Sequence, residues 1–122
     1  MNLRFPRTLC IVFFASGAMF LASGAGAQDT SDAARGKEVY AGTCVACHGP
    51  TGKGTIPGTP DFNKANGVLS QDDDVLKDHI TNGFRGRRSR MPMPAKGGNA
   101  SLTDDDVEDV LAYLHESFGS EQ

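Results

Sequence analysis

The apolar residues near the end of the chain recur at helical spacing. Four of them stand at positions i, i+3, i+4 and i+7 and share one helix face: Val107, Val110, Leu111 and Leu114. Thr103 stands before this stripe, and Asp106 follows Thr103 by three residues, which is the spacing of a capping box. The pattern predicts a helix that begins after Thr103 and buries one face.

Two weaker helical patterns come earlier in the chain. Ser31, followed by an aspartate, predicts the start of a helix that reaches Tyr40. Ser70, with Asp73 three residues on, predicts the start of another helix, which ends at Asn82-Gly83. No alternating strand pattern is present, so the sequence predicts an all-α domain.

Gly36 and Tyr40 are four residues apart and therefore share one face of the first predicted helix. A glycine in the middle of a helix costs about 1 kcal/mol relative to alanine. A close crossing with another helix explains that cost, because a side chain at Gly36 would obstruct the partner. A tolerated surface glycine is the alternative.

Residues 1–27 have the pattern of a secretory signal peptide. Arg4 and Arg7 form a positive start, an apolar run extends from Leu9 to Ala22, and Ala25-Gly26-Ala27 supplies the small-residue cleavage site. The run is shorter than the span of about 20 apolar residues that a membrane helix needs, although an uncleaved anchor remains open. We therefore expect a signal peptide over 1–27, one domain over 28–122 and export to the periplasm.

The charge and the cysteine content of the predicted domain exclude several classes of protein. Residues 28–122 carry 10 Lys and Arg against 15 Asp and Glu, a net charge of −5. This balance argues against nucleic acid or an anionic membrane as the main partner. Cys44 and Cys47 are the only cysteines outside the leader, where Cys10 has no assigned role, so no disulfide framework is expected.

The segment from Cys44 to His48 forms a Cys-x-x-Cys-His motif, which is the attachment signature of a covalently bound haem. The spacing lets each thiol add to one vinyl group of the same porphyrin, and His48 then becomes an axial ligand of the iron. A zinc site would need a second cysteine pair, and a redox dithiol would need a strand–helix–strand setting. Neither is present, so we predict one haem c bound by two thioethers.

The motif, together with the later runs Met93-Pro94-Ala95-Lys96-Gly97-Gly98 and Leu102-Thr103-Asp104, resembles the class I c-type cytochromes, in particular the small mono-haem bacterial members. The resemblance covers residues 31–118. It implies a cytochrome c fold, in which three main helices and loops wrap around one covalently attached haem. It also implies that the last helix crosses the first, with Val110 and Tyr113 against Gly36 and Tyr40.

The same resemblance implies Met93 as the second axial ligand of the iron, with Met91 as the alternative. We expect only one of the two methionines to bind the iron, because a haem iron held by His48 has one axial position left. His79 lies on an apolar helix face and is a weaker candidate. The metal ligands are then His48 and Met93, and the cofactor-binding residues are these two with Cys44 and Cys47.

The segment after the haem motif resembles the family region in which a proline carbonyl accepts the proton of the ligating imidazole. Pro60 is the predicted acceptor, with Pro57 as the second choice. Phe62 is predicted to form part of the haem wall.

A basic cluster stands out on this acidic chain: Arg85, Arg87, Arg88 and Arg90. Three interpretations are open at this point. The arginines can pair with haem propionates or internal carboxylates, they can steer an acidic redox partner, or they can be a solvated charge run.

The resemblance implies a single-electron carrier between redox protein partners, monomeric or weakly dimeric, without membrane insertion after cleavage, and without enzymatic activity. A cytochrome subunit of a periplasmic dehydrogenase or oxidase complex is the first alternative. A haem-based gas sensor, in which a weakly held methionine is displaced, is the second.

Overall fold

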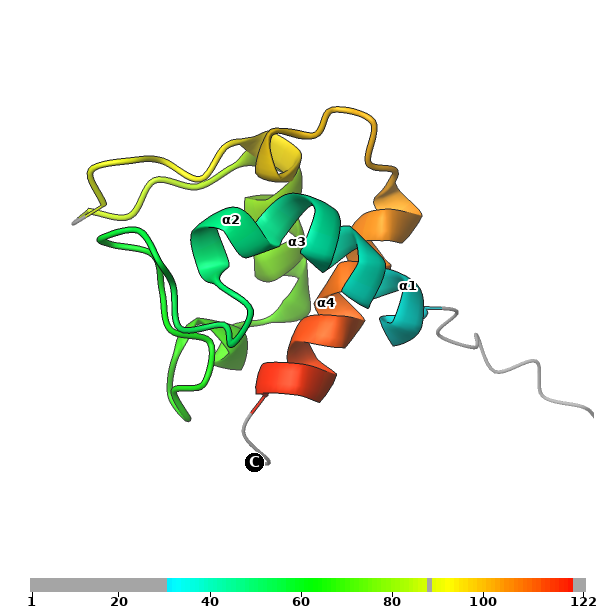
Figure 1. The fold of residues 1–122 in the computed structure, drawn as a ribbon, viewed down its shortest axis with the longest axis horizontal. Coiled ribbons are helices and arrows are strands. Elements are labelled where there is room, and N and C mark those ends of the chain that lie inside the picture. Colours follow the sequence, from blue (N-terminus) through cyan, green and yellow to red (C-terminus); the bar gives the residue numbers. More distant parts are fainter. Residues whose placement is uncertain (1–30, 88, 120–122) are drawn as a thin grey trace, which may run out of the picture.

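The computed structural model describes residues 31–87 and 89–119, so the predicted signal peptide lies outside the described residues. The described chain is helical, and its elements follow in this order (Figure 1): α1 (Ala33–Val39), a π-helical turn (Tyr40–Cys44), α2 (Val45–His48), a 3-10 turn (Val68–Ser70), α3 (Asp73–Asn82), a second 3-10 turn (Ala95–Gly98) and α4 (Asp104–Phe118). The predicted all-α class is confirmed. No helix of the described residues has the length and apolar character of a membrane span.

The boundary of α4 agrees with its sequence pattern. Thr103 caps the helix by accepting a hydrogen bond from the backbone N–H of Asp106, whose carboxylate in turn accepts one from the backbone N–H of Thr103. The four residues of the predicted stripe are all buried. The capping box thus fixes where this helix begins, and the apolar stripe supplies the face that it buries.

The two earlier helix starts differ from the prediction. Asp32, and not Ser31, caps α1, because its carboxylate accepts hydrogen bonds from two backbone N–H groups of the first turn. Ser70 lies in a 3-10 turn and donates its hydroxyl to the carbonyl of Gly67 at 2.7 Å, so it does not cap α3. Helix α3 begins instead at Asp73 and ends at Asn82, with Gly83 following as predicted.

Helices α1 and α4 cross at Gly36. A Cβ atom built on this glycine would lie 1.9 Å from the carbonyl oxygen of Asp109 and 2.9 Å from the Cβ of Tyr113. One turn later, the rings of Tyr40 and Tyr113 pack at a centroid distance of 5.3 Å. The predicted crossing is confirmed, with the backbone of Asp109 as the surface that Gly36 meets.

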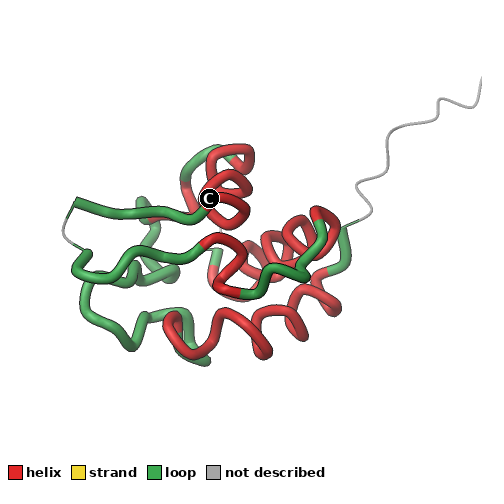
Figure 2. The backbone as a smooth tube through the Cα atoms, turned by 90° about the horizontal axis from the view of Figure 1, so that it is seen from above, coloured by secondary structure: helices red, strands yellow, loops and turns green. Residues whose placement is uncertain are grey.

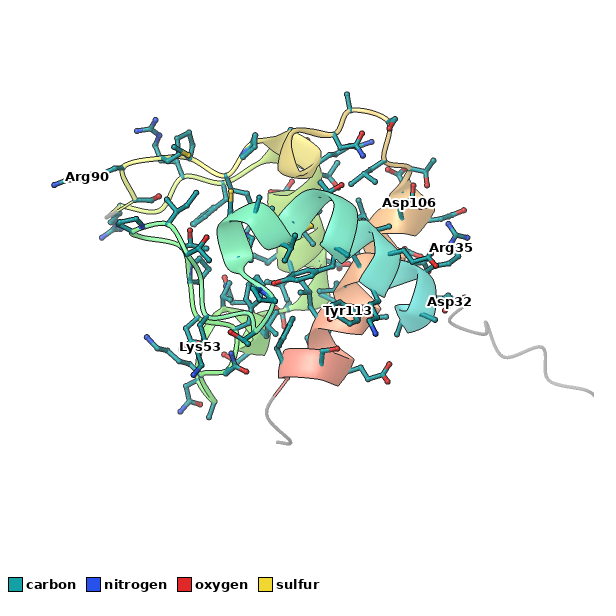
Figure 3. The ribbon with its side chains drawn as sticks, viewed as in Figure 1. Asp32, Arg35, Lys53, Arg90, Asp106 and Tyr113 are labelled. Atoms are coloured by element: carbon teal, nitrogen blue, oxygen red, sulfur yellow. The ribbon has the colours of Figure 1, made fainter. Side chains whose placement is uncertain are left out.

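Charged side chains, among them Asp32, Arg35 and Asp106, lie at the outer end of the same crossing (Figure 3). The carboxylate of Asp109, only 3% exposed, accepts a hydrogen bond from the backbone N–H of Asp32 at 2.5 Å. Its second oxygen lies 3.2 Å from Nε of Arg35, an ion-pair contact outside hydrogen-bond geometry, and Arg35 also pairs with Asp106 at 3.1 Å. Helix α4 therefore holds the first turn of α1 by charge as well as by close packing.

Helix α3 joins α4 on another side through Asp73 and His115, 2.9 Å apart, and through Lys77 and Glu108, 3.4 Å apart. Figure 2 shows the long loops leaving these helices toward one end of the molecule. The fold thus provides a helical frame on one side and loops on the other, and α2 brings the Cys-x-x-Cys-His motif between them.

A candidate haem site

A largely apolar cavity of about 380 Å³ opens between the helical frame and the loops. Its wall includes core residues of α3 and α4, such as Leu76 and Val110, and residues from the loops that follow the haem motif and α3. Binding sites for cofactors are typically concave and mostly apolar, with a few polar groups in the wall. The polar groups of this wall are therefore the candidates for chemistry.

Cys44 and Cys47 both line the cavity as half-buried, free thiols. Cys44 ends the π-helical turn, and Cys47 follows in α2, so an irregularity of the helix lies directly at the motif. Such π-turns are frequent at functional sites. Burial, followed by the charge of Cys47, raises the pKa of the Cys44 thiol to about 11. The structure thus brings both predicted attachment residues to one cavity wall.

His48 is 8% exposed and also lines the cavity. Its ring stacks on that of Phe62, with a centroid distance of 4.6 Å and an interplanar angle of 11°. Burial lowers the pKa of the imidazole, which favours the neutral form that binds metals. Phe62 is therefore a wall residue, as predicted, and it also orients the ring.

The hydrogen bond predicted from His48 to the carbonyl of Pro60 is absent from the structure. The Nδ1 atom of His48 is buried and has no hydrogen-bond partner among the described residues, so neither Pro60 nor Pro57 accepts its proton. Both prolines belong to the loop that follows the motif, and Pro60 lines the cavity. The stacking on Phe62, and not a proline carbonyl, sets the plane of the ring here.

A loop that follows the motif is bonded back onto it. The backbone N–H of Gly54 donates to the carbonyl of His48 at 2.8 Å, and that of Thr55 donates to the carbonyl of Cys47 at 2.9 Å. The Thr55 hydroxyl reaches the carbonyls of Ala46 and Cys47. These bonds satisfy the free carbonyls at the end of α2. Sequence reasoning missed Thr55, because nothing in its neighbourhood marks it as a partner of the motif.

Met91 and Met93 both border the cavity but differ in burial. Met93 is half-buried, whereas Met91 is 57% exposed. The backbone of Met93 exchanges two hydrogen bonds with Phe84, at 2.8 and 3.0 Å, in an isolated antiparallel bridge. Gly83, with φ of 82°, lies so close that its Cβ would be 2.7 Å from the carbonyl oxygen of Met93. The end of α3 therefore holds the backbone of Met93 in place.

The residues after Met93 are tied to the motif from the other side. Lys96 adopts a left-handed conformation with φ of 52°, and its ammonium donates to the carbonyl of Leu102 at 2.5 Å. A Cβ on Gly97 would lie 2.7 Å from Cγ2 of Thr43, the residue before Cys44. The Lys-Gly-Gly run is thus a turn that packs the loop containing Met93 against the π-helical turn.

His79 borders the same cavity, and its ring packs against that of Phe84 at 4.1 Å. It therefore lies within the candidate site, as part of the wall formed by α3. The three described arginines of the basic cluster make no ion pair with any carboxylate that the structure describes: Arg85, Arg87 and Arg90. For these three described arginines, pairing with internal carboxylates is therefore excluded.

The residues present fit a covalently held haem. Two free thiols and an imidazole whose pKa is lowered by burial line one apolar cavity. The fold and this donor set define the class of c-type cytochromes. The family model for cytochrome c matches residues 33–117, so the chain belongs to the cytochrome c family. Members of this family carry covalently bound haem c and transfer electrons.

Curated relatives agree with this assignment. Cytochrome c-555 of Prosthecochloris aestuarii is 40% identical over 85 residues, which cover 68% of this chain and 85% of the relative. Cytochrome c-555 of Chlorobaculum tepidum is 37% identical over 83 residues, which cover 68% and 74%. The chain is also 33% identical over 95 residues to a Cbb3-type cytochrome c oxidase subunit CcoP of Azospirillum sp., in a match that covers 73% of this chain but 30% of that subunit.

Proposed function

We propose that this cytochrome is a periplasmic single-electron carrier in which Cys44 and Cys47 attach one haem and His48 and Met93 are the axial ligands of its iron. The haem iron supplies the one-electron chemistry. The protein's part is to hold both ligands in place, to exclude water with the apolar wall and to leave partners access at the loop end. No further acid, base or nucleophile is required, so the protein acts as a carrier and not as an enzyme.

One observation carries the choice of Met93. It is half-buried on the cavity wall with its backbone bridged to Phe84, whereas Met91 is mostly exposed. A thioether that remains bound to iron must be shielded and pre-positioned, because a mobile ligand loses conformational entropy each time it binds. With His48 and Met93 both bound to the iron, a small ligand would have to displace one of these side chains.

The experiment is a redox titration of the purified haem protein, combined with carbon monoxide addition to the reduced form. We expect a reversible one-electron transition and no ready carbon monoxide complex at neutral pH. Ready carbon monoxide binding would contradict the six-coordinate carrier and favour a gas sensor. The mass of the exported protein tests cleavage after Ala27, and sedimentation tests the proposed monomeric or weakly dimeric state.

A second candidate function rests on the similarity to CcoP. This chain could serve as a cytochrome component of an oxidase or dehydrogenase complex, but the match covers only 30% of that relative. Stable co-purification with a larger enzyme from native extract would favour this candidate. Isolation as a free small cytochrome would favour the carrier.

A further inference from the structure

The predicted mature domain contains two methionines, and their surroundings differ. Met91 and Met93 are separated by Pro92, and the remaining methionines, Met1 and Met19, belong to the predicted leader. Met91 is 57% exposed, whereas Met93 is half-buried on the cavity wall. Two thioethers of the same kind therefore lie close together in the sequence, one accessible to solvent and one shielded from it.

The exposure of Met91 follows from how its backbone is held. On one side, the hydroxyl of Ser89 donates a hydrogen bond to the carbonyl of Met91. On the other side, the ring of Pro92 restricts the backbone, and the bridge described above holds Met93. Arg90, the residue before Met91, lies at the tip of the loops (Figure 3). The loop therefore presents Met91 to solvent from a supported backbone.

Core packing does not account for Met91. Among the described residues, the buried core cluster and the hydrophobic residues packed against it include neither methionine. Met91 is instead one of the three large hydrophobic residues exposed on the described surface, with Val75 and Phe84. An exposed methionine outside the core retains one property that Val75 and Phe84 lack, which is the reactivity of its thioether toward oxidants.

A thioether sulfur loses two electrons when it accepts an oxygen atom from a peroxide. With hydrogen peroxide, an S–O bond forms, the O–O bond breaks, and the second oxygen leaves as water after it takes the proton of the transferred oxygen. The product is methionine sulfoxide, which is polar and is reduced again by thiol-dependent sulfoxide reductases. An exposed sulfur reacts directly, whereas a buried sulfur reacts only when the structure opens locally.

We propose that Met91 is a site of reversible oxidation to methionine sulfoxide by peroxides, and that Met93 remains a thioether under the same conditions. The proposal rests on the proposed function in one respect, because coordination of Met93 to the iron would occupy the lone pair that a peroxide attacks. Burial protects Met93 independently of the iron. The sulfoxide of Met91 lies in solvent and outside the core, so the fold and the iron ligands are unchanged by it.

The test is the rate at which each methionine takes up oxygen. The ferric haem-loaded protein is treated with excess hydrogen peroxide, and samples are stopped with catalase at successive times. Cleavage after Arg90 and Lys96 releases both methionines in one peptide, and fragmentation of this peptide in a mass spectrometer assigns the added oxygen to Met91 or to Met93. We expect the sulfoxide of Met91 to form at least about tenfold faster, because Met93 must wait for local opening. The visible spectrum should stay unchanged while Met91 is oxidised.

Val75→Met supplies a reference for an exposed methionine in the same molecule. Val75 is 40% exposed on α3, so the introduced methionine measures how fast an accessible thioether reacts with the same peroxide. We expect Met91 to react within about threefold of that rate. Met91→Leu should take up no oxygen in the peptide on this timescale and should keep the wild-type spectrum. A sulfoxide reductase with dithiothreitol should restore the original peptide mass, as the dithiol becomes a disulfide and the oxygen leaves as water.

Three results would overturn the proposal. The first is oxygen added to Met93 before Met91 or at an equal rate, and the second is a Met91 that reacts far more slowly than the methionine introduced by Val75→Met. The third is loss of the spectral signature of sulfur ligation in step with oxidation of Met91, which would assign Met91 to the iron. Failure of the proposed function is distinguishable, because the spectrum would then lack sulfur ligation before any peroxide is added. The order of the two rates would still test the part of the proposal that rests on exposure.

Discussion

Gly36→Ala tests whether the close crossing of the two helix backbones is what holds α1 on α4. The added Cβ would lie 1.9 Å from the carbonyl oxygen of Asp109 and 2.4 Å from its carbonyl carbon. Carbon–oxygen contacts of this kind settle near about 3.3 Å or more, so the helices must separate by about 1.4 Å. Both obstructing atoms belong to the backbone, and no side-chain rotation can relieve the clash.

The expected loss of stability follows from two opposing terms. Overpacking of this kind costs about 3 kcal/mol, the upper part of the usual range, because the contact is between backbones. Alanine returns up to about 1 kcal/mol through its higher helix propensity. The net loss of about 2 kcal/mol corresponds to a fall of about 8–16 °C in Tm for a domain of this size.

The assay is thermal and urea unfolding of the haem-loaded protein, with Gly42→Ala as the control. Gly42 lies in the neighbouring π-helical turn, is exposed, and has nothing within 4 Å of the position that a Cβ would take. We expect this control to be neutral or stabilised by up to about 1 kcal/mol. If Gly36→Ala were as stable as Gly42→Ala, the close crossing would not be what holds α1 on α4.

Three further predictions concern stability. The pKa of Asp106 is lowered chiefly by hydrogen bonds from Thr103, so its contribution is present above the unfolded value of 3.8 and is lost as pH falls through the lower folded value. Acid unfolding should therefore begin at a higher pH, and from a lower stability, in Thr103→Ala than in wild type. If both proteins unfolded at the same pH, the hydrogen bonds from Thr103 would not be what stabilises the ionised Asp106. Thr55→Val should cost about 1 kcal/mol in urea unfolding through its lost bonds to α2, whereas Thr51→Val, whose hydroxyl makes no hydrogen bond within the described chain, should cost less. Lys96→Met should lower stability by about 1–2 kcal/mol, because it removes the bond to Leu102 while the left-handed backbone remains; equal stability would show that the glycines alone shape the turn.

Sequence reasoning succeeded where the decisive interactions are local. The α4 helix has its cap, its box partner and its apolar stripe within one short segment, from Thr103 to Leu114, and all three agree. The start of α1 is also local, but Ser31 and Asp32 are adjacent candidates for one cap position. Asp32 takes that position because Asp109, 77 residues away in the sequence, binds its backbone N–H. A sequence pattern does not show that Asp109 lies next to Asp32 in space. It therefore cannot decide which of the two adjacent residues caps the helix.

The same limit applies to the site. The Cys-x-x-Cys-His motif can be recognised without the fold, because consecutive residues carry it. The choice between Met91 and Met93 depends on the register of the loop after α3, which the antiparallel bridge between Phe84 and Met93 sets. The support of α2 by Thr55 and the stacking of His48 on Phe62 also arise from tertiary packing. The hydrogen bond expected from His48 to a proline carbonyl is absent, and this also depends on how the loop after the motif packs.

The most direct test of the central claim is the reduction potential and visible spectrum of Met93→Leu beside Met91→Leu. Leucine preserves apolar volume and removes the sulfur, so loss of ligation is separated from loss of packing. We expect Met93→Leu to lower the potential and to lose the spectral signature of sulfur ligation, since a thioether ligand raises the potential. Met91→Leu should retain both. The reverse result, with ligation lost in Met91→Leu and retained in Met93→Leu, would contradict the account.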